Sequence, residues 1–174
     1  MQEIEVKILD INLEEIRKKL LVLGAEKVFD GKIHAMAFDL PDMRLDKEDS
    51  FIRVRKVGEQ IELCFKGKKE EKSKFKIREE IEVNVSAFKD TIEILEKIGL
   101  KKYNEGKKNR ESYKLNNVRF EIDSWGNIPH FIEIEAKTEE EIEKNVKMLG
   151  YTMEQTNTWT YLDIERHYNA RNRS

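Results

Sequence analysis

Glu3-Ile4-Glu5-Val6-Lys7, Glu80-Ile81-Glu82-Val83-Asn84 and Glu133-Ile134-Glu135-Ala136-Lys137 are three copies of one pattern. In each copy a Glu-Ile-Glu tripeptide is followed by a small apolar residue and then by a polar one. Because side chains alternate between the two faces of a β-strand, each copy places its glutamates on one face and its aliphatic residues on the other. The pattern predicts three strands that each have a charged face and an apolar face.

Other segments show the same alternation with positive charges. Arg53 and Arg55 share one face of a strand-like segment, and Lys108 and Arg110 share a face of another. A single strand with a polar face is ordinary, because an antiparallel sheet often turns one face to water. Fixed charges of both signs on nearly every strand instead favour a sheet that closes on itself, with the charged face inside and helices packed outside.

Each Glu-Ile-Glu strand precedes an amphipathic segment with helix signals. Asn12 and Gly24 flank the first of these segments, the second runs over 86–99 and the third over 138–150. The predicted fold is therefore α+β, with helices covering the apolar side of the strands. We expect one domain over 1–168 and a C-terminal tail over 169–174. The lysine-rich stretch 66–76 is expected to be a solvated hairpin loop; the alternative is a lip that attracts phosphate.

Composition limits the classes of function. The 174 residues are 39% charged and 39% hydrophobic, with a formal net charge of -2. This balance excludes a globally basic protein that binds nucleic acid through bulk charge, so no nucleic-acid partner is expected. A single cysteine, Cys64, excludes an internal disulfide and a cysteine zinc cluster, and we assign it to the barrel wall without chemistry. With no leader and no apolar run of membrane length, we expect a cytoplasmic protein without a membrane partner.

The charged residues suit one kind of ligand. Carboxylates at Glu3, Glu5, Asp123, Glu133 and Glu135 offer the oxygen ligands that Mg²⁺ and Mn²⁺ prefer. Arginine and lysine side chains bind phosphate oxygens through charge-assisted hydrogen bonds. No glycine-rich phosphate loop and no Ser-His-Asp arrangement is present. Together these residues predict a site for a polyphosphate bound with a divalent metal.

The ordered set of motifs resembles the CYTH superfamily of triphosphate tunnel metalloenzymes. The resemblance begins at Glu3-x-Glu5-x-Lys7 and ends at Glu133-Ile134-Glu135. It implies an eight-stranded antiparallel β-barrel forming a triphosphate tunnel, with Mg²⁺ or Mn²⁺ held by Glu3, Glu5, Asp123, Glu133 and Glu135. It implies a triphosphate-binding set of Lys7, Arg53, Arg55, Lys66, Arg78, Lys108 and Arg110. The implied catalytic candidates are Lys7, Glu80 and Glu82.

The resemblance also implies a set of functions. The first is metal-dependent hydrolysis of a small triphosphate: tripolyphosphate, thiamine triphosphate or a nucleoside triphosphate. The alternatives are a class IV adenylyl cyclase, which converts ATP to cyclic AMP and pyrophosphate, and a non-catalytic polyphosphate or nucleotide-binding module. Such cyclases often carry a His-Phe pair upstream of the first motif, where this chain has only Met1 and Gln2, so hydrolysis is expected. The sequence leaves open whether the chain is a monomer or a homodimer.

Overall fold

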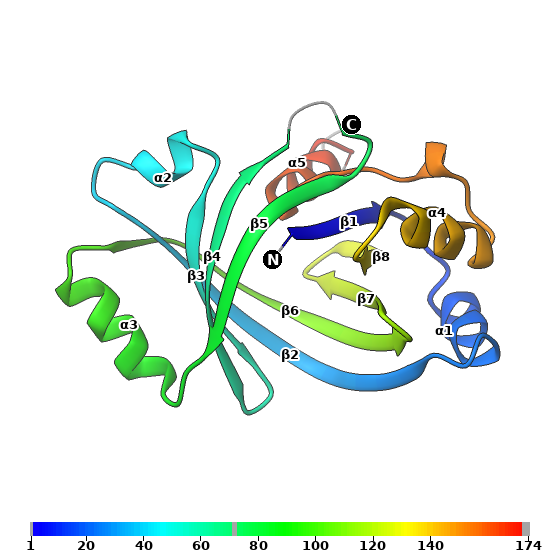
Figure 1. Cartoon of the computed structure of the whole chain (residues 1–174), viewed down its shortest axis with the longest axis horizontal. Coiled ribbons are helices and arrows are strands. Elements are labelled where there is room, and N and C mark those ends of the chain that lie inside the picture. Colours follow the sequence, from blue (N-terminus) through cyan, green and yellow to red (C-terminus); the bar gives the residue numbers. More distant parts are fainter. Residues whose placement is uncertain (1, 71–72, 172–174) are drawn as a thin grey trace. The chain divides into compact units, whose positions relative to one another are not determined.

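A computed structural model describes residues 2–70 and 73–171, and for residues 2 and 3 it describes the backbone alone. The strands are β1 (Gln2–Ile8), β2 (Glu26–Asp39), β3 (Phe51–Val57), β4 (Gln60–Lys69), β5 (Lys76–Asn84), β6 (Lys101–Leu115), β7 (Val118–Trp125) and β8 (Ile128–Ala136). They close into a barrel in the order β1-β5-β4-β3-β2-β6-β7-β8 (Figure 1). The closed barrel confirms the predicted α+β fold.

The helices are α1 (Leu13–Val22), α2 (Arg44–Lys47), α3 (Phe88–Lys97), α4 (Glu139–Met148) and α5 (Tyr161–Arg171), with a short 3₁₀ turn, η1, at Met153–Gln155. The chain divides into two compact units, which we describe separately. Of the described residues, the first unit comprises 2–3, 31–70, 73 and 77–109, and the second comprises 4–30, 74–76 and 110–171. None of the helices in the described residues is long and apolar enough to cross a membrane.

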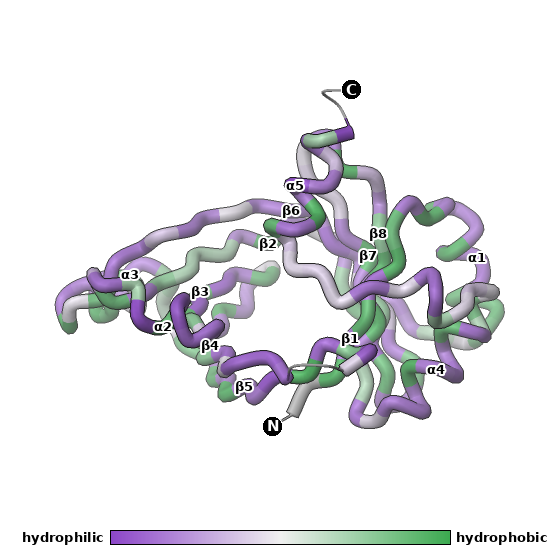
Figure 2. Tube along the Cα trace, turned by 90° about the horizontal axis from the view of Figure 1, so that it is seen from above, coloured by the Kyte–Doolittle hydropathy of each residue, from purple (hydrophilic) through white to green (hydrophobic). Residues whose placement is uncertain are grey.

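In the first unit, β2, β3, β4 and β5 pair antiparallel in register. Arg55 of β3 lies opposite Ala35 of β2 and Glu62 of β4, which keeps the charged side chains on one face of the sheet. Figure 2 shows hydrophilic and hydrophobic residues following one another along β3. The alternation in the sequence therefore predicted this face correctly.

Helix α3 packs on the apolar face of this sheet. Its Leu95 joins Phe38 of β2 and Val54 of β3 in a buried core, together with partly buried residues such as Leu63 of β4. The helix does not cover the apolar face of the strand that precedes it, since Ile81 and Val83 of β5 remain 56% and 52% exposed. The expectation that the helices cover the apolar side of the strands is wrong for β5, because α3 follows a turn that returns it over β3.

In the second unit, α1 and α4 form as the sequence predicted. Asn12 accepts a hydrogen bond from the backbone N–H of Glu15, and Thr138 does the same for Glu141. Gly24 ends the first helical segment with a positive φ of 80°, a conformation that glycine adopts without a Cβ penalty. Helix α4 contacts β8. The two helices lie near each other (Figure 1), and Lys19 of α1 donates to the carbonyl of Leu149, which follows α4.

Two helices were not predicted from the sequence, and one strand end differs from the expectation. The short helix α2 forms because the buried Asp39 carboxylate accepts hydrogen bonds from the backbone N–H groups of Leu45 and Asp46. Helix α5 continues past residue 168 to Arg171. The expected 66–76 loop is shorter, because β4 continues through a bulge to Lys69 and Phe75 is buried. Residues 71 and 72 of that loop lie outside the described part of the chain.

Candidate functional site

Lys7 lies at the centre of a buried group of charges in the second unit. Lys7 of β1 lies opposite Glu133 of β8, which in turn lies opposite Glu121 of β7, and Glu5 precedes Lys7 by two residues on β1. The Lys7 ammonium lies 2.6 Å from a carboxylate oxygen of Glu5 and 2.6 Å from one of Glu133, and its side chain has 0% exposure. Burial alone would lower the pKa of Lys7, but the carboxylates of Glu133 and Glu5 raise it above its ordinary value. Lys7 is therefore a fixed positive charge.

Arg110 of β6 supplies a second buried cation to this group. Its Nε and Nη2 donate to the two oxygens of Asp123 at 2.7 and 2.6 Å, which makes a bidentate pair. Nη2 also lies 3.5 Å from Glu133. Burial would lower the pKa of Arg110, yet the negative charge of Asp123 holds it well above the ordinary value. We call Glu5, Lys7, Arg110, Glu121, Asp123 and Glu133 the Lys7 cluster.

The carboxylates of the Lys7 cluster repel one another. Burial raises the pKa of Glu121, and the neighbouring carboxylates of Glu133 and Asp123 add to this rise although Arg110 opposes it. Ser112 also donates a hydrogen bond to Glu121. Outside the cluster, Lys76 reaches Glu5 at 2.6 Å. The charges of Glu133 and Asp123 thus oppose ionisation of Glu121, and a hard divalent cation bound among these carboxylates would offset that repulsion.

The first unit holds a second group of paired charges. Arg55 donates to Glu62 at 2.5 Å, and Lys66 lies 2.9 Å from Glu80. Arg53 lies 3.5 Å from Glu80 and 3.8 Å from Glu82. We call Arg53, Arg55, Glu62, Cys64, Lys66, Glu80 and Glu82 the Arg53 cluster. Three of its members are the cations predicted to bind phosphate, and each of them lies beside a carboxylate.

The side chain of Cys64, which the sequence assigned to the barrel wall without chemistry, lies on the charged face of β4. Its thiol donates to Glu80 at 2.9 Å, and burial raises its pKa to about 12. Ligand atoms of Cys64, Glu80 and Glu82 lie within 4.8 Å of one another, a spacing that suits a metal ion. Cations already pair with both carboxylates, Arg53 and Lys66 with Glu80 and Arg53 and Arg55 with Glu82, and the thiol stays protonated, so this trio is a poor cation site as it stands.

Arg78 has a different environment from the other predicted phosphate ligands. Its guanidinium donates to the Asp49 carboxylate at 2.7 Å, to the Asp49 carbonyl at 3.0 Å and to the Gly67 carbonyl at 3.1 Å. It also lies over the ring of Phe51. These contacts fix the turn at Asp49, whose φ is 53°. In this structure Arg78 joins the loop after α2 to β4.

The remaining predicted site residues are placed as follows. Lys108 and Glu135 are half-buried, and Glu135 lies between Glu5 and Arg119 in the strand register. The side chain of Glu3 lies outside the described residues. Sequence reasoning did not select Glu121, although it shares a face with Asp123 and alternation could have identified it. It also missed Tyr161 of α5, whose hydroxyl contacts Asp123 and for which the strand pattern gives no signal.

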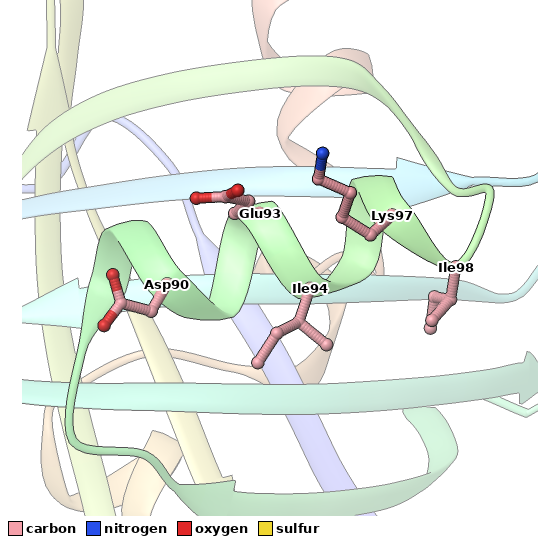
Figure 3. Close-up of a pocket in the computed structure, with 5 residues that line it drawn as sticks. All are labelled: Asp90, Glu93, Ile94, Lys97 and Ile98. Atoms are coloured by element: carbon pink, nitrogen blue, oxygen red, sulfur yellow. The ribbon is translucent and has the colours of Figure 1, made fainter.

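A surface hollow on α3 is separate from these charges. It is lined by Asp90, Glu93, Ile94, Lys97 and Ile98 (Figure 3). Ile94 and Ile98 are 61% and 69% exposed there. The hollow lies on the outer side of a helix whose other side fills the core with Leu95, so it is a feature of the surface and not of the charged face.

Comparison with known proteins gives the family. The family model of the CYTH domain matches residues 1–154. The chain belongs to the CYTH family. The "putative adenylate cyclase MJ0240" of Methanocaldococcus jannaschii is 33% identical over 153 residues, which cover 87% of this chain and 85% of that protein. This family membership confirms the resemblance seen in the motifs.

Solved structures of CYTH-like proteins share the fold. The PH1012 protein of Pyrococcus horikoshii superposes with a TM-score of 0.76 at 29% identity, over 94% of this chain and 98% of that one. A Hippeastrum protein described as a "putative adenylyl cyclase" that "reveals a dominant" triphosphatase activity superposes with a TM-score of 0.63 at 16% identity, over 86% and 87%. CYTH enzymes of the triphosphate tunnel type act on nucleotide or triphosphate substrates and use divalent metals.

Proposed function

We propose that this CYTH protein is a metal-dependent enzyme that hydrolyses the terminal phosphoanhydride bond of a compact triphosphate. The observation that carries the proposal is the Lys7 cluster, in which buried cations and buried carboxylates occur together. A site that only bound anions would gain nothing from buried acids that repel its ligand. A site for a metal-bound polyphosphate uses both.

The cations would bind the phosphate chain. Lys7 keeps its proton, so it serves as a positive charge and a hydrogen-bond donor rather than as a general base. Arg110 presents a planar fork that fits two phosphate oxygens as well as it fits the Asp123 carboxylate. Arg53, Arg55 and Lys66 offer the same chemistry in the Arg53 cluster. A phosphate oxygen would take the place of a carboxylate oxygen at each of these donors.

The carboxylates would hold Mg²⁺ or Mn²⁺. The proposed ligands are Glu5, Asp123 and Glu133, with Glu3 and Glu135 as further members of the predicted set. A bound divalent ion neutralises charge that develops on phosphate oxygens and favours ionisation of water. We assign Glu80 and Glu82 the role of orienting Arg53 and Lys66, which they contact. In hydrolysis, a water oxygen bonds to the terminal phosphorus, the bridging P–O bond breaks and the water proton passes to a nearby carboxylate or to solvent.

Adenylyl cyclisation is the second candidate, favoured by the name of the Methanocaldococcus jannaschii relative. Cyclisation requires a place for the adenine base as well as for the phosphates. The rings beside the Lys7 cluster are used in packing: Trp125 lies 5.6 Å from Phe131 and 5.4 Å from Tyr161, edge to face in both pairs. These rings pack against one another, which supports a compact substrate.

Product analysis tests the proposal. The purified chain is incubated with tripolyphosphate, thiamine triphosphate or ATP, each with Mg²⁺ and with Mn²⁺, and the products are separated by chromatography. We expect orthophosphate from tripolyphosphate. Glu133→Gln should lower turnover by about 100-fold or more, since removing even an outer-shell partner of a metal ligand typically costs 10–100-fold. Glu143→Gln, on the exposed side of α4, is the matched control and should react as the wild type does.

Three results would contradict the proposal. Cyclic AMP and pyrophosphate from ATP, with tripolyphosphate unchanged, would establish the cyclase instead. Binding of tripolyphosphate without turnover under any metal would establish the non-catalytic module. Normal turnover by Glu133→Gln at saturating Mg²⁺ would remove Glu133 from the metal site.

A further inference from the structure

The chain beyond the matched CYTH region contributes to the Lys7 cluster. The family match ends at residue 154, and the next segment pairs with β1 at Lys7 itself. The Lys7 N–H donates to the Asn157 carbonyl at 2.8 Å, and the Asn157 N–H donates to the Lys7 carbonyl at 2.9 Å. The Asn157 side-chain amide adds a bond of 3.2 Å to the same carbonyl. The backbone of this segment is therefore fixed beside the cluster.

The start of α5 is fixed as well. The Asp163 carboxylate accepts from the backbone N–H and the hydroxyl of Thr160, at 2.9 and 2.6 Å. The hydroxyl of Thr160 accepts from the N–H of Asp163, as an N-cap residue does. Further along α5, Ile164 is fully buried against Phe131 of β8. Tyr161, the first residue of the helix, is thus held at both ends of the first turn.

The Tyr161 side chain reaches into the Lys7 cluster. Its hydroxyl donates to Oδ2 of Asp123 at 2.9 Å and accepts from Nη2 of Arg110 at 3.0 Å. The Lys7 ammonium lies 5.6 Å from the centre of its ring. Burial raises the pKa of Tyr161 well above its ordinary value, and the negative charges of Asp123 and Glu133 add to the rise. The hydroxyl therefore bridges the Asp123 carboxylate and the Arg110 guanidinium.

We propose that Tyr161 is a positioning residue that keeps the Asp123 carboxylate oriented for a divalent cation when Arg110 turns to a phosphate. This inference rests on the proposed function. As long as Arg110 forms its bidentate pair with Asp123, the arginine itself fixes the carboxylate. Once a phosphate takes the donors of Arg110, that support is withdrawn and the Tyr161 hydroxyl still holds Oδ2.

The size of the expected effect follows from the chemistry of metal ligands. Partners that hydrogen-bond a ligating carboxylate fix its orientation, and their loss typically lowers metal affinity by about 10–100-fold. Tyr161→Phe removes only the hydroxyl, because the phenyl ring still packs against Trp125 and Phe131. Tyr168→Phe is the matched control: this residue lies on the same helix, and its hydroxyl donates to Asp10 at 2.8 Å, outside the cluster.

The experiment measures binding of Mn²⁺ alone and of Mn²⁺ with tripolyphosphate, by calorimetry and by the electron paramagnetic resonance signal of free Mn²⁺. We expect Tyr161→Phe to weaken Mn²⁺ binding about 10–100-fold in the presence of tripolyphosphate and less in its absence. Tyr168→Phe should bind Mn²⁺ as the wild type does in both conditions. In turnover assays, Tyr161→Phe should require more metal for half-maximal rate while the KM for tripolyphosphate at saturating metal stays within about twofold of wild type.

Two outcomes would overturn the inference. If Tyr161→Phe binds Mn²⁺ as the wild type does, the hydroxyl does not position Asp123 for the ion. A melting temperature lowered as in Tyr168→Phe would then show that its role is purely structural. Tighter binding would mean that the hydroxyl competes with the ion. The test is distinct from that of the proposed function, because Mn²⁺ binding is measured without turnover: a wild-type chain that binds Mn²⁺ but hydrolyses nothing refutes the hydrolase and still tests Tyr161.

Discussion

At the scale of the residue, Lys7 shows how this protein keeps a full charge without water. The side chain has no exposed surface, and two carboxylates at 2.6 Å replace its hydration. Removing one member of such a buried group leaves the others uncompensated. The remaining buried charges then destabilise the folded state, so the cluster is sensitive to single substitutions.

Lys7→Met tests this balance. The variant keeps a long side chain but leaves Glu5 and Glu133 with less positive charge, so we expect the free energy of unfolding to fall by about 3–5 kcal/mol at pH 7. Added Mn²⁺ should restore part of the loss, because a divalent cation can replace the ammonium between the acids. Thermal unfolding with and without Mn²⁺ measures both effects. A variant as stable as the wild type, or one that Mn²⁺ leaves unchanged, would contradict the assignment of these carboxylates to a cation site.

Glu111 gives a pH-dependent prediction outside the Lys7 cluster. It accepts from Arg17 of α1 and from Tyr113, and it lies 3.0 Å from Lys27. Burial would raise its pKa, but the hydrogen bonds from Arg17 and Lys27 lower it from 4.5 to about 2. Because the pKa of the folded state is below that of the unfolded state, the stabilisation is complete above about pH 4.5 and disappears as the pH falls toward 2.

Glu111→Gln should therefore be less stable than the wild type by about 1–3 kcal/mol at pH 7. The difference should shrink steadily below about pH 4.5. Urea unfolding at a series of pH values measures it, with Glu14→Gln as the control, since the pair of Glu14 with Arg17 is exposed. A difference that stays constant down to pH 2 would show that the charge of Glu111 is not what stabilises α1 against β6.

At the scale of the element, the apolar sides of β3 and β5 lie in different environments. Val54 is fully buried beneath α3, whereas Ile81 of β5 is 56% exposed on the apolar side that α3 leaves uncovered. Val54→Ala should cost about 1–3 kcal/mol through lost burial and a residual cavity. Ile81→Ala should cost no more than about 1 kcal/mol. Denaturant unfolding compares the two, and an equally large loss for Ile81→Ala would show that something covers β5 in solution.

The sequence predicted the strands and three helices for a physical reason. Charged and aliphatic residues alternate with the two-residue period of side chains along a β-strand. Asn12, Gly24 and Thr138 are helix-capping residues, which mark the ends of helices without any tertiary contact. The charged residues themselves suggested Glu5, Asp123 and Glu133 as site residues, and the family resemblance added Lys7; the described structure brings these four side chains together. Their individual roles remain predictions.

What the sequence did not predict depends on contacts between distant segments. Periodicity predicts the face on which Arg55 lies, but only the register of β3 on β4 places Glu62 opposite it. Arg78 shares the alternation of the other cations, yet a bulge in β4 and the turn at Asp49 direct its guanidinium to carbonyl groups. Tyr161 lies on α5, and its approach to the Lys7 cluster depends on the pairing of the preceding Asn157 with Lys7. No pattern in the sequence of the helix predicts that pairing.

At the scale of the whole molecule, ligand binding and folding are linked. A ligand that binds only the folded chain stabilises it by about 2.7 kcal/mol at a hundredfold excess over its dissociation constant. Tripolyphosphate with Mg²⁺ should therefore raise the melting temperature of the wild type. The size of this shift reports on binding whether or not turnover is measured, so variants without activity can be compared.

Val54→Ala and Arg55→Ala separate folding from binding, because they are neighbours on opposite faces of β3. Both should be destabilised: Val54→Ala by its cavity, and Arg55→Ala by about 1–3 kcal/mol because Glu62 loses the guanidinium 2.5 Å away. Val54→Ala keeps every predicted phosphate ligand, so tripolyphosphate should raise its melting temperature as much as it raises that of the wild type. Arg55→Ala should show a much smaller shift. Restoring the lost charge balance with Arg55→Ala/Glu62→Ala should recover stability but not the response to tripolyphosphate, since a phosphate ligand is still missing. If the double variant responds like the wild type, Arg55 serves only to neutralise Glu62, and the Arg53 cluster does not bind the triphosphate through this residue.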